Sequence, residues 1–206
     1  GDLHPTRLLI AYQCGIFPWY SEGQPILWFS PDPRYVLDPS KLRISRSLKK
    51  VVRKGVYTIT MNQAFEEVIQ NCSAIARPRQ YGTWITSEMK EAYVELHRIG
   101  RAHSIEAWRD GVLVGGLYGV INGALFAGES MFAKSPDASK VAFVWTVKQL
   151  EQWGVELIDC QVYTEHLERF GAEEIPRQTY LRRLRELSNR ELGVKKWQFD
   201  PDLRPL

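Results

Sequence analysis

Two carboxylates and one carboxamide stand at the ends of apolar segments in the second half of the chain. Glu129 follows the apolar residues 124–127, and Asp159 and Gln161 close the run 157–161. An acid or an amide carried into or beside a core must find a polar partner or cost several kcal/mol. Such groups are typical of functional sites, so Glu129, Asp159 and Gln161 are the candidate catalytic residues.

The spacing of Asp159 and Gln161 predicts how they are oriented. Alternate residues of a strand face the same side, so we expect these two side chains on one face and Cys160 on the other. A small buried thiol is a common core residue, and Cys160 has no histidine close to it in the sequence. We therefore interpret Cys160 as a packing residue.

The elements that must position these residues predict an α+β chain. Apolar spacings of three and four predict helices, and alternating apolar runs predict strands. The expected helices cover residues 5–14, 46–53, 62–71, 86–99, 139–153 and 176–187, with a short one opening at Thr164. We expect Ser45 or Ser47 to cap the second of these helices, Gly55 to end it, and Asn62 to cap the third. The expected strands cover residues 56–60, 102–108, 112–121, 124–127 and 156–160. Tight Asp-Gly and Asn-Gly turns join the middle three strands into an antiparallel meander.

The N-terminal part of the chain has a different composition from the rest. Residues 15–39 are rich in proline and aromatic side chains and predict a rigid loop that forms an aromatic platform. Residues 41–54 contain seven basic residues and no acidic one. This helix is either an ordinary solvated face or a phosphate-binding surface. We predict a small N-terminal domain of residues 1–60 and a larger domain of residues 61–206.

Composition excludes several classes of protein. With 44% hydrophobic and 25% charged residues, the chain is neither disordered nor fibrous. No apolar run approaches the roughly 20 residues that a membrane span needs, and the N-terminus has no secretory pattern. Three distant cysteines without CxxC spacing predict neither disulfides nor a zinc site. These features favour a cytoplasmic protein with no metal and no membrane association.

The order of the elements resembles the acetyltransferase-like (GNAT-like) fold. That fold binds the pyrophosphate of coenzyme A with a glycine-rich turn before its long helix. Here residues 130–139 occupy that place and contain no glycine. The coenzyme A interpretation is weakened accordingly.

Nine short motifs, in order, resemble one bacterial family. They are Gly15-Ile16-Phe17-Pro18-Trp19, Trp28-Phe29-Ser30-Pro31-Asp32-Pro33-Arg34, Gly82-Thr83-Trp84-Ile85, His103-Ser104-Ile105-Glu106, Gly115-Gly116-Leu117-Tyr118-Gly119, Gly128-Glu129-Ser130-Met131-Phe132, Ala138-Ser139-Lys140, Ile158-Asp159-Cys160-Gln161 and His166-Leu167. Each motif is weak alone, but the series is specific and resembles the leucyl/phenylalanyl-tRNA–protein transferases.

The resemblance implies transfer of leucine, or less well phenylalanine, from aminoacyl-tRNA to proteins with N-terminal arginine or lysine. The product is a degradation signal of the N-end rule. An aminoacyl ester is already activated, so the enzyme must orient an amine, remove its proton and stabilise an oxyanion, without metal or other cofactor. The resemblance assigns a proton relay to Asp159 and Gln161 and a positioning role to Glu129.

Other residues take binding roles by the same resemblance. Members of the apolar aminoacyl pocket are Leu117, Phe126, Met131 and Ile158, with Ser130 beside them; each could also be ordinary core. The terminal adenosine of the tRNA is expected on Trp28 and Trp84, by base stacking. Contacts with tRNA phosphates are expected from Arg46, Lys49, Lys50 and Arg53.

Three alternatives stay open at this point. One is an acyl-coenzyme A acetyltransferase, and another is a tRNA-binding module without catalytic activity. The third is a related transferase that moves an amino acid from tRNA to cell-wall precursors.

Overall fold

The computed structural model describes residues 1–75, 83–194 and 196–206. The helices are α1 (Pro5–Gln13), α2 (Arg46–Lys54), α3 (Phe65–Ala74), α4 (Ser87–Arg98), α5 (Ala138–Gln152), α6 (Glu165–Glu168) and α7 (Arg177–Leu187), with a 3-10 turn η1 (Pro39–Lys41). The strands are β1 (Phe17–Pro18), β2 (Trp28–Phe29), β3 (Arg34–Leu37), β4 (Thr58–Met61), β5 (Ala102–Arg109), β6 (Val112–Asn122), β7 (Leu125–Ala133), β8 (Leu157–Gln161) and β9 (Glu173–Ile175). The α+β class is confirmed.

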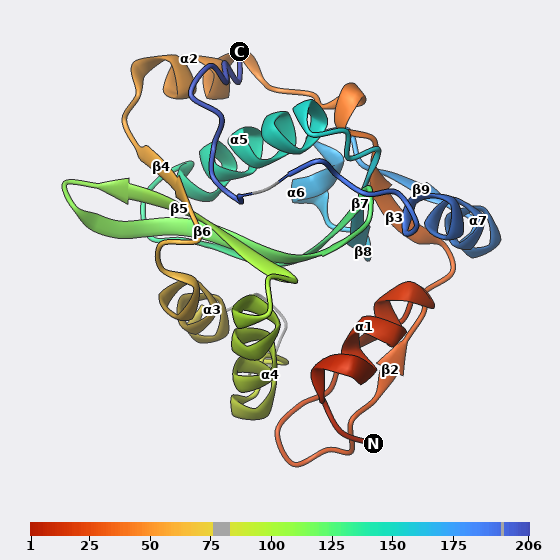
Figure 1. The fold of residues 1–206 in the computed structure, drawn as a ribbon. Coiled ribbons are helices and arrows are strands. Elements are labelled where there is room, and N and C mark those ends of the chain that lie inside the picture. The colour runs from red at the N-terminus through yellow and green to blue at the C-terminus, as the bar shows by residue number, and fades with distance from the viewer. Residues whose placement is uncertain (76–82, 195) are drawn as a thin grey trace.

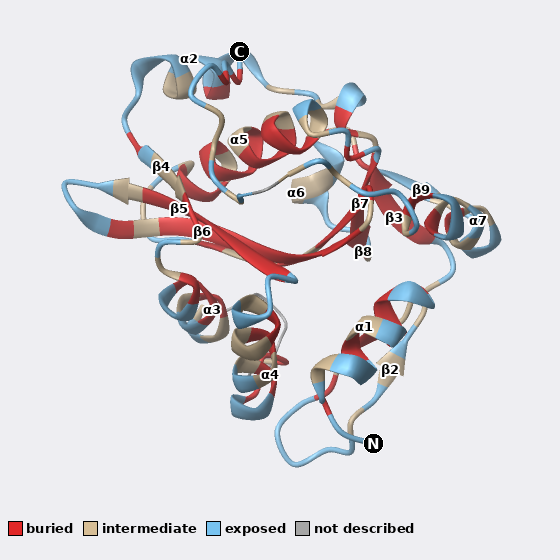
Figure 2. Cartoon of the chain, viewed as in Figure 1, coloured by how far each residue is buried: buried red, intermediate tan, exposed pale blue. Residues whose placement is uncertain are grey.

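One large mixed sheet organises the molecule. Its seven strands run in the order β4-β5-β6-β7-β8-β3-β9. Helices α5 and α2 cover one face, α3 and α4 cover the other, and α1 lies to one side with the short β1-β2 ribbon (Figure 1). Burial is concentrated in the central strands and in α5, as Figure 2 shows. The core thus consists of two apolar layers separated by the sheet.

The predicted meander is present as β5, β6 and β7. Its two hairpins turn at Gly111 and Gly123, both of which have positive φ, as tight turns require. However, β7 continues to Ala133 instead of ending at residue 127. The segment Gly128-Glu129-Ser130 interrupts its apolar pattern, so the sequence underestimated its length. Glu129 and Ser130 consequently lie within a strand.

Next to the edge strand β9, the sheet contains a strand, β3, that the sequence did not predict. Residues 34–37 were expected in a loop, yet β3 pairs antiparallel with β8 on one side and with β9 on the other. All four of its residues are buried. The surrounding prolines and the short length hid this strand. It belongs to the predicted N-terminal domain of residues 1–60, and that division stays a prediction.

Helix ends follow local capping chemistry. Ser45 caps α2 by accepting from the Leu48 N–H at 3.2 Å, and Gly55 ends this helix in the left-handed conformation, as predicted. The expected cap of α3 at Asn62 is wrong. Asn62 instead has a positive φ and its side chain accepts from the Ser104 N–H at 3.1 Å.

Between β7 and β8 the chain crosses over through α5. The two strands are parallel, so their neighbouring ends meet at the N-terminal end of α5 and the start of α6. Among the described residues, no helix is both long and apolar enough to cross a membrane. Each of the three cysteines carries a thiol.

Candidate active site

A cavity of about 570 Å³ lies against strands β6, β7 and β8 and the inner side of α5. Its lining includes aromatic residues of the N-terminal segment, among them Phe17 and Trp19. Glu129 and Gln161 also line it. The cavity therefore combines a largely apolar lining with a carboxylate and an amide.

Glu129 is the carboxylate that lines this cavity. It is 8% exposed, and its oxygens accept hydrogen bonds from Tyr12 at 2.7 Å, Tyr93 at 3.2 Å and the Gln161 amide at 2.8 Å. Burial raises the pKa of Glu129 to about 7, against the lowering effect of the Tyr12 hydrogen bond. Glu129 can therefore take up and release a proton near neutral pH.

Asp159 has a different environment. The Arg34 guanidinium binds both of its oxygens, with Nε–Oδ1 at 2.8 Å and Nη2–Oδ2 at 2.6 Å, and Tyr180 donates to Oδ2 at 2.8 Å. Burial alone would lower the pKa of Arg34, but the Asp159 charge raises it above its usual value. Both side chains are 1% exposed, so the ion pair is fully buried.

Gln161 links the two carboxylates through different groups. Its backbone N–H donates to Asp159 Oδ1 at 2.9 Å, while its side-chain amide reaches Glu129. Gln161 has φ +66, a left-handed conformation that costs a non-glycine residue on the order of 1 kcal/mol. Hydrogen bonds on both sides of the residue offset this cost.

The positive φ of Gln161 corrects one expectation. Asp159 and Gln161 were expected on one face of β8 and Cys160 on the other. Instead Gln161 and Cys160 both line the cavity, whereas Asp159 is outside the lining and faces Arg34. Burial raises the pKa of the Cys160 thiol, with a further contribution from Asp159, so this cysteine is a neutral packing group.

The cavity lining includes the residues that the sequence selected for the aminoacyl pocket. The cavity is lined by Leu117, Phe126, Ser130, Met131 and Ile158. Phe143 and Thr146 of α5 also line the cavity. A helix residue that faces a ligand has the same periodicity as one that faces the core, which is why Phe143 was missed.

The two selected tryptophans lie in different places. Trp84 lines the cavity and is 7% exposed. Trp28 is half-buried in β2 and packs against the core, outside the described lining. Its place beside Trp84 is taken by Trp19, with ring centroids 6.1 Å apart.

Four polar partners of the site were not identified from the sequence: Tyr12, Arg34, Tyr93 and Tyr180. The tyrosines have the spacing of ordinary core aromatics. For Arg34 a signal existed, because a cation directly precedes the apolar residues Tyr35-Val36-Leu37 and must enter the sheet with them.

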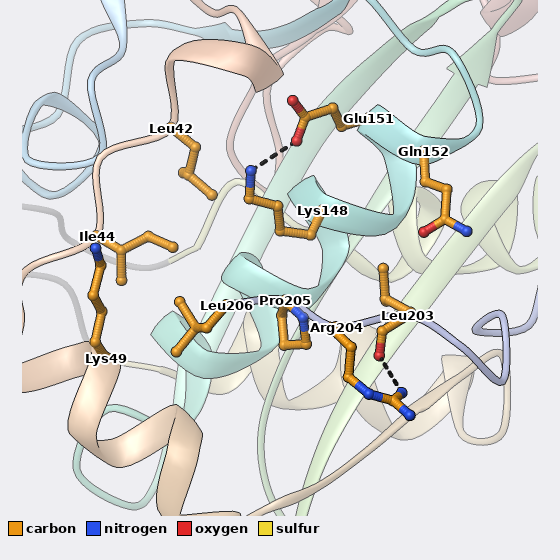
Figure 3. Close-up of a pocket in the computed structure, with 10 residues that line it drawn as sticks. All are labelled: Leu42, Ile44, Lys49, Lys148, Glu151, Gln152, Leu203, Arg204, Pro205 and Leu206. Carbon is orange, nitrogen blue, oxygen red and sulfur yellow. Dashed lines mark hydrogen bonds and ion pairs between the residues drawn. The ribbon is translucent and has the colours of Figure 1, made fainter.

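The basic helix lies apart from the cavity. Arg46, Lys49, Lys50 and Arg53 are exposed, and none of them forms an ion pair within the described ranges. Lys49 lines a second hollow of about 550 Å³ between α2, α5 and the C-terminal residues 203–206 (Figure 3). Arg204 also lines this hollow, as does Lys148, which is paired with Glu151 at 2.8 Å.

Comparison with known proteins assigns the chain to a family. The model of the leucyl/phenylalanyl-tRNA protein transferase matches residues 36–185, and that of its N-terminal domain matches residues 1–32. A leucyl/phenylalanyl-tRNA–protein transferase from Myxococcus xanthus is 63% identical over 81% of this chain and 71% of its own length. One from Anaeromyxobacter sp. strain Fw109-5 is 58% identical over 100% of this chain and 87% of its own.

Solved structures resemble the chain only distantly. The C-terminal domain of a putative lysylphosphatidylglycerol synthetase from Agrobacterium fabrum is 12% identical, covers 92% of this chain and 60% of its own, and gives a TM-score of 0.44. That likeness supports no conclusion about function.

The family matches define the chain as an acyl-group transferase, and the largely apolar cavity that Glu129 and Gln161 line is its candidate active site. The sequence matches make the assignment specific: this chain belongs to the leucyl/phenylalanyl-tRNA–protein transferase family. The expectation of an aminoacyltransferase is confirmed.

Proposed function

We propose that this chain transfers leucine or phenylalanine from aminoacyl-tRNA to the N-terminal arginine or lysine of a protein, which marks that protein for degradation. The observation that supports this proposal is the cavity, whose lining is largely apolar but includes Glu129 and Gln161. The apolar lining suits an uncharged amino-acid side chain, and the two polar side chains suit an amine. We further propose that residues 61–206 form a GNAT-like catalytic domain.

The reaction is an aminolysis of an ester. The acceptor α-amine attacks the carbonyl carbon of the aminoacyl ester, a peptide bond forms, and the bond to the terminal ribose oxygen of the tRNA breaks. The amine loses a proton and the ribose oxygen gains one. Because the ester is already activated, positioning and proton transfer supply most of the rate increase, and no metal or other cofactor is required.

We propose that Asp159, Gln161 and Glu129 act as a connected set, with roles that differ from the Asp159–Gln161 proton relay that the resemblance implies. Glu129 accepts the proton, since it lines the cavity and its pKa lies near neutrality. Gln161 orients the amine beside it. Asp159, with its oxygens held by Arg34 and Tyr180, fixes the Gln161 backbone instead of taking the proton itself.

The tRNA has two proposed contacts. Trp84, paired with Trp19, offers an aromatic face for the terminal adenine, and Trp28 supports the same region from the β1-β2 ribbon. The exposed cations Arg46, Lys49, Lys50 and Arg53 contact phosphates of the tRNA body. Charged tRNA as donor and cysteines that remain thiols favour a cytoplasmic location.

A transfer assay tests this function. Purified chain is given leucyl-, phenylalanyl- or isoleucyl-tRNA and a peptide with N-terminal arginine, and the same peptide with an acetylated N-terminus serves as control. We expect leucine and, more slowly, phenylalanine on the free arginyl peptide alone. Transfer to a muropeptide instead, or tRNA binding without transfer, would contradict the proposal, as would acetyl transfer from acetyl-coenzyme A.

Variants separate the roles of the three polar residues. Asp159→Asn and Gln161→Ala are each expected to slow single-turnover leucyl transfer strongly. If both variants retain the wild-type rate, the proposed set of three residues is wrong.

A further inference from the structure

The C-terminal segment returns across the sheet and packs beside α5. It runs from α7 along the α5 side of the sheet and ends beside α2 (Figure 1). Asp200 attaches it to α5, because its carboxylate accepts from Gln149 Nε2 at 2.6 Å and from Trp153 Nε1 at 3.1 Å. The Asp200 N–H also donates to Gln149 Oε1 at 2.7 Å. Three hydrogen bonds thus fix the position of this segment.

This attachment places Trp197 on the sheet. Its ring is stacked on His103 of β5, with centroids 3.5 Å apart and planes 1° from parallel, and it contacts Trp153 edge-on at 5.1 Å. Asn62 donates to the Trp197 carbonyl at 3.4 Å. The indole is therefore held by two rings and by its backbone.

Trp197 also reaches a wall of the cavity. Its centroid lies 6.3 Å from that of Phe126, with an angle of 30° between the ring planes. Phe126 lines the cavity, whereas Trp197 is outside the described lining. The indole consequently stands behind Phe126 with respect to the ligand space.

Phe126 is confined on another side by β6. A Cβ atom added at Gly119 would lie 2.4 Å from Phe126 Cζ and 2.6 Å from Cε1, so the ring occupies the space that a side chain would need. Gly119 pairs with His103 across the β5-β6 ladder. The glycine therefore lies beside the residue on which the Trp197 ring stacks. The Phe126 ring is thus bounded by Gly119 and by Trp197.

We propose that Trp197 is a specificity-determining residue, which sets the depth of the apolar cavity by backing the Phe126 ring. This inference rests on the proposed function, because it assumes that the cavity receives the aminoacyl side chain. With the indole removed, Phe126 can move into the vacated space and the cavity deepens. The larger phenylalanyl group should then gain relative to leucyl, since pocket fit discriminates by about 1–3 kcal/mol per methylene.

The test compares the two donors in the full chain. For Trp197→Ala, we expect kcat/KM for phenylalanyl-tRNA relative to leucyl-tRNA to rise by at least about fivefold, mainly through KM. Trp197→Phe keeps a flat ring behind Phe126 and should restore a ratio within about twofold of wild type. An equal loss with both donors would mean that Trp197 only stabilises the fold, and would overturn the proposal.

Phe199→Ala is the matched control. Phe199 also docks the C-terminal segment, against Trp145 at 5.5 Å, and it makes no ring contact with Phe126 among the described residues. Its donor ratio should stay at the wild-type value; a shift as large as that of Trp197→Ala would overturn the proposal. If Trp197→Ala does not fold, Trp197→Leu replaces it with the same expected direction, and an unchanged ratio contradicts the inference. Failure of the wild-type chain with both donors would instead refute the proposed function.

Discussion

Arg34 and Asp159 lie 125 positions apart in the chain and form a buried ion pair with Nη2 and Oδ2 at 2.6 Å. The pair joins the start of β3 to β8, directly behind Gln161. Arg34 also donates to the Gly15 carbonyl at 3.1 Å, and its guanidinium lies 4.4 Å from the centre of the Tyr180 ring. The Arg34 side chain, from the N-terminal segment, therefore fixes the position of Asp159.

Removal of Arg34 should destabilise the fold strongly. Arg34→Met leaves Asp159 charged and buried without its cationic partner, so we expect a loss of about 3–5 kcal/mol in the free energy of unfolding, measured by urea denaturation. Arg190→Met is the matched control because its partner Glu156 is half-exposed; the expected loss is below about 1 kcal/mol. Similar losses for both variants would show that the buried pair has no special role.

The pH dependence of transfer should report Glu129. With a pKa of about 7 for the proton acceptor, the single-turnover rate should rise with pH through that value as the carboxylate forms. Glu129→Gln should lower the plateau rate by about 10²-fold and abolish this rise, which leaves only titration of the acceptor amine near pH 8. A rise near pH 7 that survives in Glu129→Gln would assign it to another group.

Glu129 should have the opposite effect on stability: the free energy of unfolding should fall, not rise, as its carboxylate ionises. Because burial raises the pKa of Glu129 from 4.5 to about 7, folding favours its protonated form. This contribution is fully present below pH 4.5 and is lost as pH rises through about 7. The stability of wild type relative to Glu129→Gln should therefore fall across that interval, as thermal unfolding can measure. A constant difference would mean that Glu129 has an ordinary pKa.

Substitution of the two selected tryptophans should give unequal effects. Trp84 lines the cavity, so Trp84→Ala should raise KM for leucyl-tRNA by about tenfold or more, as expected for loss of a base stack worth about 1–3 kcal/mol. Trp28→Ala should change KM less because this ring lies outside the described lining. Trp84→Phe controls for folding. A larger effect at Trp28 would place the adenine on the β1-β2 ribbon.

The basic helix should determine the salt dependence of tRNA binding. Combined replacement of Lys49, Lys50 and Arg53 by alanine should reduce the slope of log affinity against log salt by about 0.7–0.9 for each phosphate that the helix no longer neutralises. Arg182 and Arg185, which are exposed on α7, provide a control pair of equal charge type. An unchanged slope in the α2 variant would identify this helix as a solvated face.

The sequence predicted the helices and strands that are defined by local periodicity and by turn or cap residues. The β5-β6-β7 meander follows from alternation and two tight turns, and α2 follows from Ser45 and Gly55. Strand β3 was missed because four residues among prolines carry almost no periodicity, although long-range pairing with β8 stabilises it. Its position in the sheet depends on residues more than a hundred positions away.

In the candidate site, too, the sequence predicted some features, and others depend on tertiary structure. Residue types and motif resemblance selected Glu129, Asp159 and Gln161, and the structure connects all three. Their orientation could not be predicted, because the left-handed backbone of Gln161 arises from tertiary hydrogen bonds. The partners Arg34 and Tyr180 become recognisable only when β3 and α7 meet β8.

The pairing of β3 with β8 has a consequence during synthesis. Arg34 leaves the ribosome long before Asp159 has been translated, with 125 positions between them, and until then its charge has no place in a core. Closing so long a loop is slow, because the chain loses conformational entropy before the stabilising contacts between its ends can form. The nascent chain therefore acquires its polar site only after β8 has been translated, so chains that stop before β8 lack the Arg34–Asp159 pair.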